Sequence, residues 1–223
     1  MSPAFPVGGF TYSHGLEWAI EEGTVTSAAS LERWLGDVLV HGAGQSDAIL
    51  LVQAHRAAAA GDVGRLAEVI ELSAALQPSK ERRLEATAQG AAFVRAIADT
   101  WSNDAFAQLT AALGAAFATR GGRVPWTHAP AVGAAAAAHG LAADDVVAAF
   151  VQAFAANVVS AGVRAIPLGQ SDGLRIVRAL TPVVRRIAAA AEIADCDGVG
   201  GAAVLADIAS MKHETQYTRL FRS

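Results

Sequence analysis

Cysteine is almost absent from this 223-residue sequence, which contains only Cys196. A single cysteine excludes an intramolecular disulfide framework and cannot by itself form a thiolate metal site. The first residues also lack the basic stretch followed by an apolar stretch that marks a secretory signal peptide. We therefore expect a cytoplasmic protein.

Charge is also scarce. Charged residues make up 17% of the chain, against about 25% in an average globular protein. The formal net charge of -4 provides no chain-wide positive field for nucleic acid or for an anionic membrane. We expect no nucleic-acid partner, and we expect protein partners to cover part of a surface that has few charges.

Strand patterns are missing, because no segment alternates apolar and polar residues for long enough. Hydrophobic residues reach 53% and aromatic residues only 6%, and much of the apolar share is alanine, the strongest helix former. The length fits one domain. The sequence predicts an all-α, single-domain bundle of about nine to ten helices over residues 1–223.

Apolar spacing and breaker residues locate the helices. Leu31, Trp34 and Leu35 begin a stripe that Thr26 or Ser27 could cap. Five further helices are predicted from apolar positions within residues 49–52, 66–73, 106–117, 174–187 and 204–211. Two more are predicted to begin at Ser79 and Asp144, and another has Pro130 in its first turn. Pro182 could kink the helix that contains residues 174–187.

The segment Val146–Val163 has no charged residue and is as long as the about 18 residues that a membrane span requires. Gln152, Asn157 and Ser160 interrupt it, and alanine contributes little transfer energy. This composition favours a helix buried on all sides within the protein, so no membrane association is predicted.

One pattern suggests catalysis. Gly169-Gln170-Ser171-Asp172-Gly173 matches the G-x-S-x-G turn of serine hydrolases, which requires a buried strand before the serine and a later acid and histidine. That context is missing, so Ser171 is interpreted as a helix cap and the hydrolase is kept only as an alternative. Zincin, paired-cysteine and phosphate-loop motifs are also missing, and we predict that the protein is not an enzyme.

None of the six histidines has a His, Cys or carboxylate at strong metal-ligand spacing. His213-Glu214 is a weak, transient candidate for a borderline metal such as nickel. A stable centre needs three or four convergent ligands, so no stably bound metal or cofactor is expected. A helical nickel-storage protein stays open as an alternative.

The two ends of the chain are unusual. Pro3 and Pro6 favour an extended start, and Gly8-Gly9 permits close backbone approach. Residues 212–223 place Tyr217, Leu220 and Phe221 at the very end, where chains usually fray into polar residues. These side chains could bind a partner or pack back on the protein's own core, and both interpretations stay open.

Three motifs resemble those of the UreF family of urease accessory proteins. They are SPAFPVGGFTYSHGLE at Ser2–Glu17, IPLGQ at Ile166–Gln170, and SMKHETQY at Ser210–Tyr217 followed by RLFRS at Arg219–Ser223. The resemblance implies a helical chaperone that dimerises and bridges UreD (also called UreH) and the GTPase UreG. The complex would deliver nickel, in transit, to apo-urease for GTP-dependent metallocentre assembly.

The resemblance also implies roles for single residues. The tail 212–223 would be a docking segment that orders against UreD, and the dimer would present a composite surface to UreG. The partner contacts would be Tyr12, Glu17, Gln170, Tyr217, Arg219, Leu220, Phe221 and Arg222. The residues that shape the backbone would be Pro6, Gly8, Gly9 and Gly169.

Overall fold

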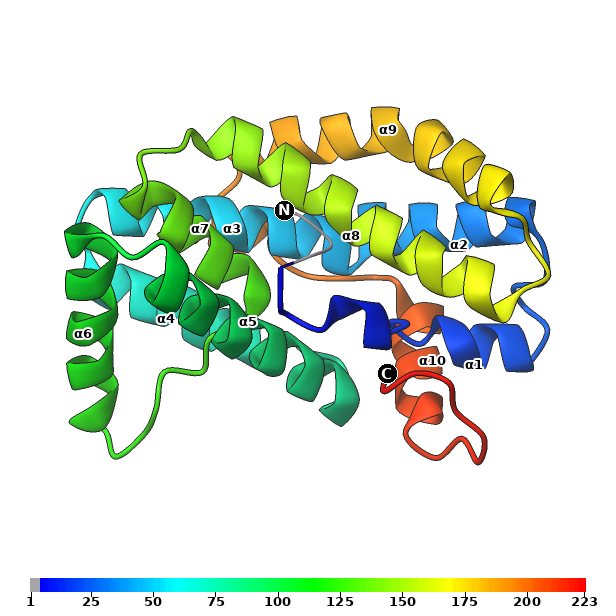
Figure 1. Cartoon of the computed structure of the whole chain (residues 1–223), viewed down its shortest axis with the longest axis horizontal. Coiled ribbons are helices and arrows are strands. Elements are labelled where there is room, and N and C mark those ends of the chain that lie inside the picture. The colour runs from blue at the N-terminus through cyan, green and yellow to red at the C-terminus, as the bar shows by residue number, and fades with distance from the viewer. Residues whose placement is uncertain (1–4) are drawn as a thin grey trace.

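The computed structural model describes residues 5–223, and over that range the chain is helical with no strand. Figure 1 shows long helices packed side by side, with α4 and α6 at one end of the molecule and α1 and α10 at the other. The predicted all-α class is confirmed. The elements are η1 (Gly9–Thr11), α1 (Leu16–Glu21), α2 (Ala28–His41), α3 (Ala43–Ala59), α4 (Val63–Ala75), α5 (Lys80–Thr100), α6 (Asp104–Ala118), α7 (His128–Ala138), α8 (Ala143–Ala165), α9 (Gln170–Ile193), η2 (Cys196–Gly198) and α10 (Val204–His213).

Polar side chains cap the starts of several helices. Ser27, Asp62, Ser79 and Asn103 accept hydrogen bonds from the first turns of α2, α4, α5 and α6. Such caps satisfy backbone N–H groups that have no partner within the helix. Of the two caps considered for α2, Thr26 and Ser27, the structure has Ser27, and the helix start predicted at Ser79 is confirmed.

The N-terminus of α9 differs from the prediction in one respect. Gly169, not Ser171, is the N-cap residue, and Asp172 accepts a hydrogen bond from the Gly169 N–H at 3.0 Å. The cap prediction for Ser171 is wrong because the acidic side chain three residues after Gly169 satisfies the helix start. The helix then continues through Pro182 to Ile193.

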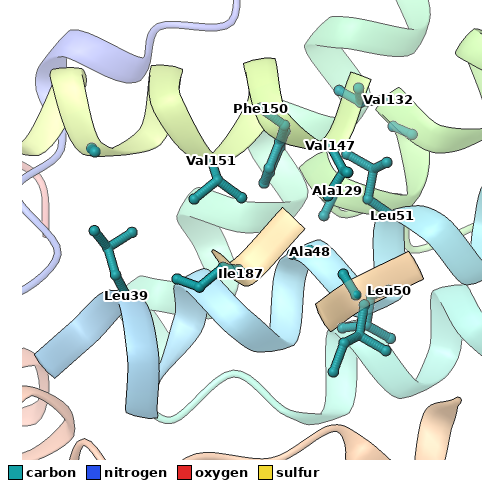
Figure 2. Packing of buried hydrophobic residues seen from close by; sticks show 14 of the residues in the cluster. Leu39, Ala48, Leu50, Leu51, Ala129, Val132, Val147, Phe150, Val151 and Ile187 are labelled. Atoms are coloured by element: carbon teal, nitrogen blue, oxygen red, sulfur yellow. The ribbon is translucent and has the colours of Figure 1, made fainter. Parts of the chain in front are cut away.

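Close backbone contacts build the centre of the protein. Helix α3 packs against α7, α8 and α9, and Figure 2 shows Leu51, Val132, Val147 and Phe150 from three of these helices converging. A Cβ on Gly133 of α7 would lie 2.2 Å from the Leu51 carbonyl oxygen. Glycine therefore sets the spacing of α3 and α7 at this contact.

Helix α8 contains the charge-free segment. Among the described residues it is the one helix whose length and composition would suit a membrane span, a test that core helices also pass. Its residues Val147, Phe150, Val151 and Val158 are buried, and it packs against α9 and α3. These contacts are those of a core helix.

The two ends of the chain lie together. Figure 1 shows the C-terminal tail returning beside η1 and the start of α1. The backbone N–H of Arg222 donates to the Thr11 carbonyl at 2.8 Å, and the N–H of Ser13 donates to the Ser223 carbonyl at 2.5 Å. The tail therefore packs on its own chain, which was one of the two interpretations left open.

Candidate partner-docking site at the joined chain ends

The N-terminal segment is held on α8 by its backbone carbonyls. Asn157 donates to the Gly9 carbonyl at 2.8 Å, and Arg164 donates to the Phe10 carbonyl at 2.7 Å. Gly8 adopts a φ of 72°, a region that favours glycine. The α8 side chains thus fix the path of the segment into α1.

A left-handed turn then brings α1 against α10. His14 and Gly15 have φ values of 58° and 77°. A Cβ on Gly15 would lie 2.7 Å from the backbone nitrogen of Ser210, so only glycine lets the α10 backbone approach this closely. The turn sets the position of α10 and of the tail that follows it.

Glu17 of α1 accepts hydrogen bonds from the tail backbone. Its Oε1 accepts the Leu220 N–H at 2.6 Å, and its Oε2 accepts the Phe221 N–H at 3.0 Å. His213 Nε2 lies 3.0 Å from the same Oε2. Only 7% of Glu17 is exposed, and hydrogen bonds to a buried carboxylate are stronger than those between neutral groups.

His213 joins this carboxylate to a second one. Its Nδ1 lies 2.6 Å from Glu81 Oε2, and the His213 side chain has no exposed surface. Glu81 Oε1 accepts from Arg219 of the tail at 2.6 Å. Residues of α1, α5, α10 and the tail are thereby connected by one set of charged groups.

The end of the tail is buried. Phe221 is 6% exposed, and the Arg164 guanidinium lies 4.6 Å from the centre of its ring, a favourable cation–π placement. The Ser223 carbonyl accepts from both the backbone N–H and the hydroxyl of Ser13. The Ser223 hydroxyl donates to Glu85 Oε2 at 2.6 Å.

Other apolar side chains at this end face solvent. Tyr217 is fully exposed, and Leu220 is 73% exposed. Helix α10 also leaves large apolar side chains exposed, namely Val204, Leu205, Ile208 and Met211. Exposed apolar side chains beside a rigidly held backbone are typical of protein interaction sites.

A buried charged cluster lies behind the tail. Glu85 forms an ion pair with Arg82, lies 3.0 Å from His14 Nε2, and accepts from Gln89 at 3.0 Å. Burial raises the pKa of Glu85, but Arg82 and His14 outweigh that effect and hold the pKa well below its usual range. Glu85 is therefore an ionised acceptor for Ser223.

Two cavities meet at this cluster. One of about 270 Å³ lies beside α10, and one of about 1100 Å³ lies between the N-terminal segment and α5, α7 and α8. Both are lined by His14, Asp47, Gln77 and Arg82. Burial raises the pKa of Asp47 to about 6. These four polar side chains thus lie between the two cavities.

The structure places most of the predicted contact residues together. Tyr12, Glu17 and the tail residues from Tyr217 to Arg222 belong to the joined ends, although Tyr12, Glu17 and Phe221 are buried and Arg222 is exposed. Gln170 is exposed in the first turn of α9. Over residues 5–223, no hydrogen bond connects the Gln170 side chain to the tail.

The backbone-shaping residues have mixed placements. Gly8 has a left-handed conformation but no close neighbour, Gly9 lies against Asn157, Pro6 is exposed, and Gly169 caps α9. The sequence interpretation did not single out the roles of Ser13, Glu81, Glu85 and Arg164. Ser13 lies inside the N-terminal motif, which was an available signal, whereas Glu81 and Arg164 carry none that distinguishes them from surface charges.

The surroundings of Ser171 and of the histidines differ from those of catalytic and metal sites. Ser171 is exposed on α9, and the helix α8 precedes this turn where a hydrolase has a strand. Over the described part of the chain, no three His, Cys, Asp or Glu side chains are placed to hold a metal ion. The ring nitrogens of His213 already face two carboxylates.

The fold and the site together define an all-α protein whose candidate site is a polypeptide surface. The sequence profile of the UreF family matches residues 25–181, which is more than half of the chain. The chain belongs to the UreF family of urease accessory proteins. It is therefore an accessory protein and not an enzyme.

Similar proteins cover the whole chain. Two relatives, each called urease accessory protein UreF, are 48% identical to it and come from Bradyrhizobium sp. strain BTAi1 and Rhodopseudomonas palustris strain HaA2. A third, from Methylorubrum populi, is 47% identical. The alignments include 100% of this chain and 89%, 90% and 96% of the respective relatives.

Proposed function

We propose that this protein is a cytoplasmic scaffold for urease maturation that dimerises and bridges UreD (UreH) and the GTPase UreG. The complex delivers nickel to apo-urease for GTP-dependent metallocentre assembly. The observation that carries the proposal is the ordered tail, which buries Phe221 while Tyr217 and Leu220 remain exposed. These two exposed side chains are the proposed contacts with UreD.

The energetics of recognition support this assignment. A fully exposed tyrosine gains little from folding, whereas tyrosine and arginine anchors often dominate protein interfaces. The tail backbone is already fixed by Glu17 and Ser13. The resemblance implies a tail that orders against UreD, whereas here the tail is held by its own chain, so a partner loses little affinity to ordering the segment.

The cavities support passage of nickel rather than storage. The lining residues His14, Asp47 and Gln77 offer nitrogen and oxygen donors, and sites that transfer ions must bind weakly enough to release them. A storage site would need three or four convergent ligands. Nickel is thus the cargo that moves through the assembly and not a resident cofactor of this chain.

Deleting residues 215–223 tests the docking role. The deletion removes the proposed contact pair, and we expect the helical far-ultraviolet circular dichroism to remain while UreD is no longer captured in a pull-down. Tyr217→Ala with Leu220→Ala should weaken capture without changing the fold. The matched control is Leu174→Ala, which removes an equally exposed leucine from α9. Unchanged capture by the truncated chain would rule out the docking role.

A further inference from the structure

We propose that Glu17, Glu81 and His213 act as positioning residues that hold the C-terminal tail, and that they do not contact the partner themselves. We call these three residues the carboxylate clamp. The clamp deepens the proposed docking function, because it determines which tail side chains are buried and which are displayed. Its own test needs no partner protein.

Glu17 has a hydrogen-bonding role that a neutral side chain cannot fill. Its two oxygens accept the N–H groups of Leu220 and Phe221, and Oε2 also lies 3.0 Å from the Nε2 of His213. Both oxygens of a carboxylate accept, whereas a glutamine replaces one of them with a donor NH₂ group. A glutamine at this position would turn that donor toward at least one donor of the tail or of His213.

His213 links the carboxylate of Glu17 to that of Glu81. Each of its ring nitrogens faces a carboxylate oxygen, which accepts and does not donate. The ring therefore connects the two acidic side chains on α1 and α5. Arg219 of the tail forms an ion pair with Glu81, so one of the two carboxylates also has a positively charged partner.

The clamp also explains the alternation of exposure along the tail. Glu17 binds the backbone of two consecutive residues, Leu220 and Phe221. The Phe221 ring lies under Arg164, and Leu220 points to solvent. Fixing these N–H groups therefore fixes which of the two side chains is available to a partner.

The test is amide hydrogen exchange of the full-length protein, read at Leu220 and Phe221. Glu17→Gln should lower the protection of these amides by at least about tenfold, the effect of losing a charge-assisted hydrogen bond. The matched control is Glu22→Gln, at the C-terminal end of the same helix, where the side chain contacts Trp18 and Thr24. Unchanged protection in the folded Glu17→Gln variant would overturn the clamp.

A second pair of variants avoids any change in the core. Leu220→Pro removes one of the two donated N–H groups, and Leu220→Ala keeps it while removing the same exposed side chain. We expect the Phe221 amide to lose protection only in the proline variant. Equal protection in both variants would contradict the clamp.

The Glu81 contact is tested by His213→Gln, which can satisfy only one carboxylate as a donor. Tail protection should fall in this variant, and in Glu81→Ala, while the amides of α3 keep theirs. Loss of tail protection with unchanged UreD capture would leave the clamp standing and would contradict the docking function. Unchanged tail protection would overturn the clamp whatever happens to capture.

Discussion

Glycine residues decide how closely the central helices approach each other. A Cβ on Gly133 would lie 2.2 Å from the Leu51 carbonyl oxygen, and one on Gly90 would lie 2.3 Å from the Trp126 carbonyl oxygen. Backbone atoms cannot move aside as flexible side chains can. Glycine positions inside helices that were predicted from alanine content thus set the packing distance.

Gly133→Ala is expected to destabilise the fold by about 1–3 kcal/mol, the usual cost of overpacking. Gly114→Ala on α6 is the control, because a Cβ there meets no atom within 4 Å. That substitution should stabilise the fold by up to about 1 kcal/mol through helix propensity. Urea unfolding measures both values, and equal effects at the two sites would contradict the packing argument.

Asp47 makes stability depend on pH. Burial raises its pKa to about 6, so between about pH 4 and pH 6 the folded state binds more protons and its stability falls as pH rises. Burial lowers the pKa of His128 to about 4, which has the opposite effect in this window. The two effects oppose each other in the wild-type protein.

The substitution Asp47→Asn separates the pH effect of Asp47 from that of His128. The variant cannot ionise at this position. Its free energy of unfolding should therefore exceed that of the wild type by a larger margin at about pH 7.5 than at about pH 4, and the two margins should differ by about 1–2 kcal/mol. Urea unfolding at both pH values measures the difference. If the variant differed from the wild type by the same free energy of unfolding at both pH values, Asp47 would ionise as easily in the folded protein as in the unfolded chain.

At the scale of elements, local signals predicted most helices. The stripe from Leu31 to Leu39 and the cap at Ser27 are sufficient for α2, because both depend on neighbours within one or two turns. Helix α5 buries Arg82, Glu85 and Gln89, and its inner face could not be predicted from apolar spacing. Those polar residues are buried because distant elements supply their partners.

Helix α1 approaches α10 closely at Gly15. Gly15→Ala places a Cβ 2.7 Å from the Ser210 nitrogen and strains a backbone at φ 77°. We expect α10 and the tail to lose amide protection while α3 keeps its own. Gly23→Ala is the control, since it has a similar φ of 84° but meets no atom within 4 Å. Equal loss of tail protection in both variants would show that the close contact has no special role.

For the whole molecule, the meeting of the two chain ends is the feature that sequence patterns could not predict. Glu17 and Leu220 form a hydrogen bond across 203 positions, and no periodicity reports a contact of that range. The motif resemblance identified both ends as important. It did not separate Glu17 and Phe221, which are buried, from Tyr217 and Leu220, which are exposed.

We propose that this chain acts through its displayed tail and not through bond chemistry. The most direct measurement is nickel-dependent activation of apo-urease by UreD, UreG and this protein, comparing the wild type with the Tyr217→Ala, Leu220→Ala double variant. We predict that the double variant folds normally, captures less UreD and activates little urease. Full activation by this variant would show that the displayed side chains of the tail are not needed for urease maturation.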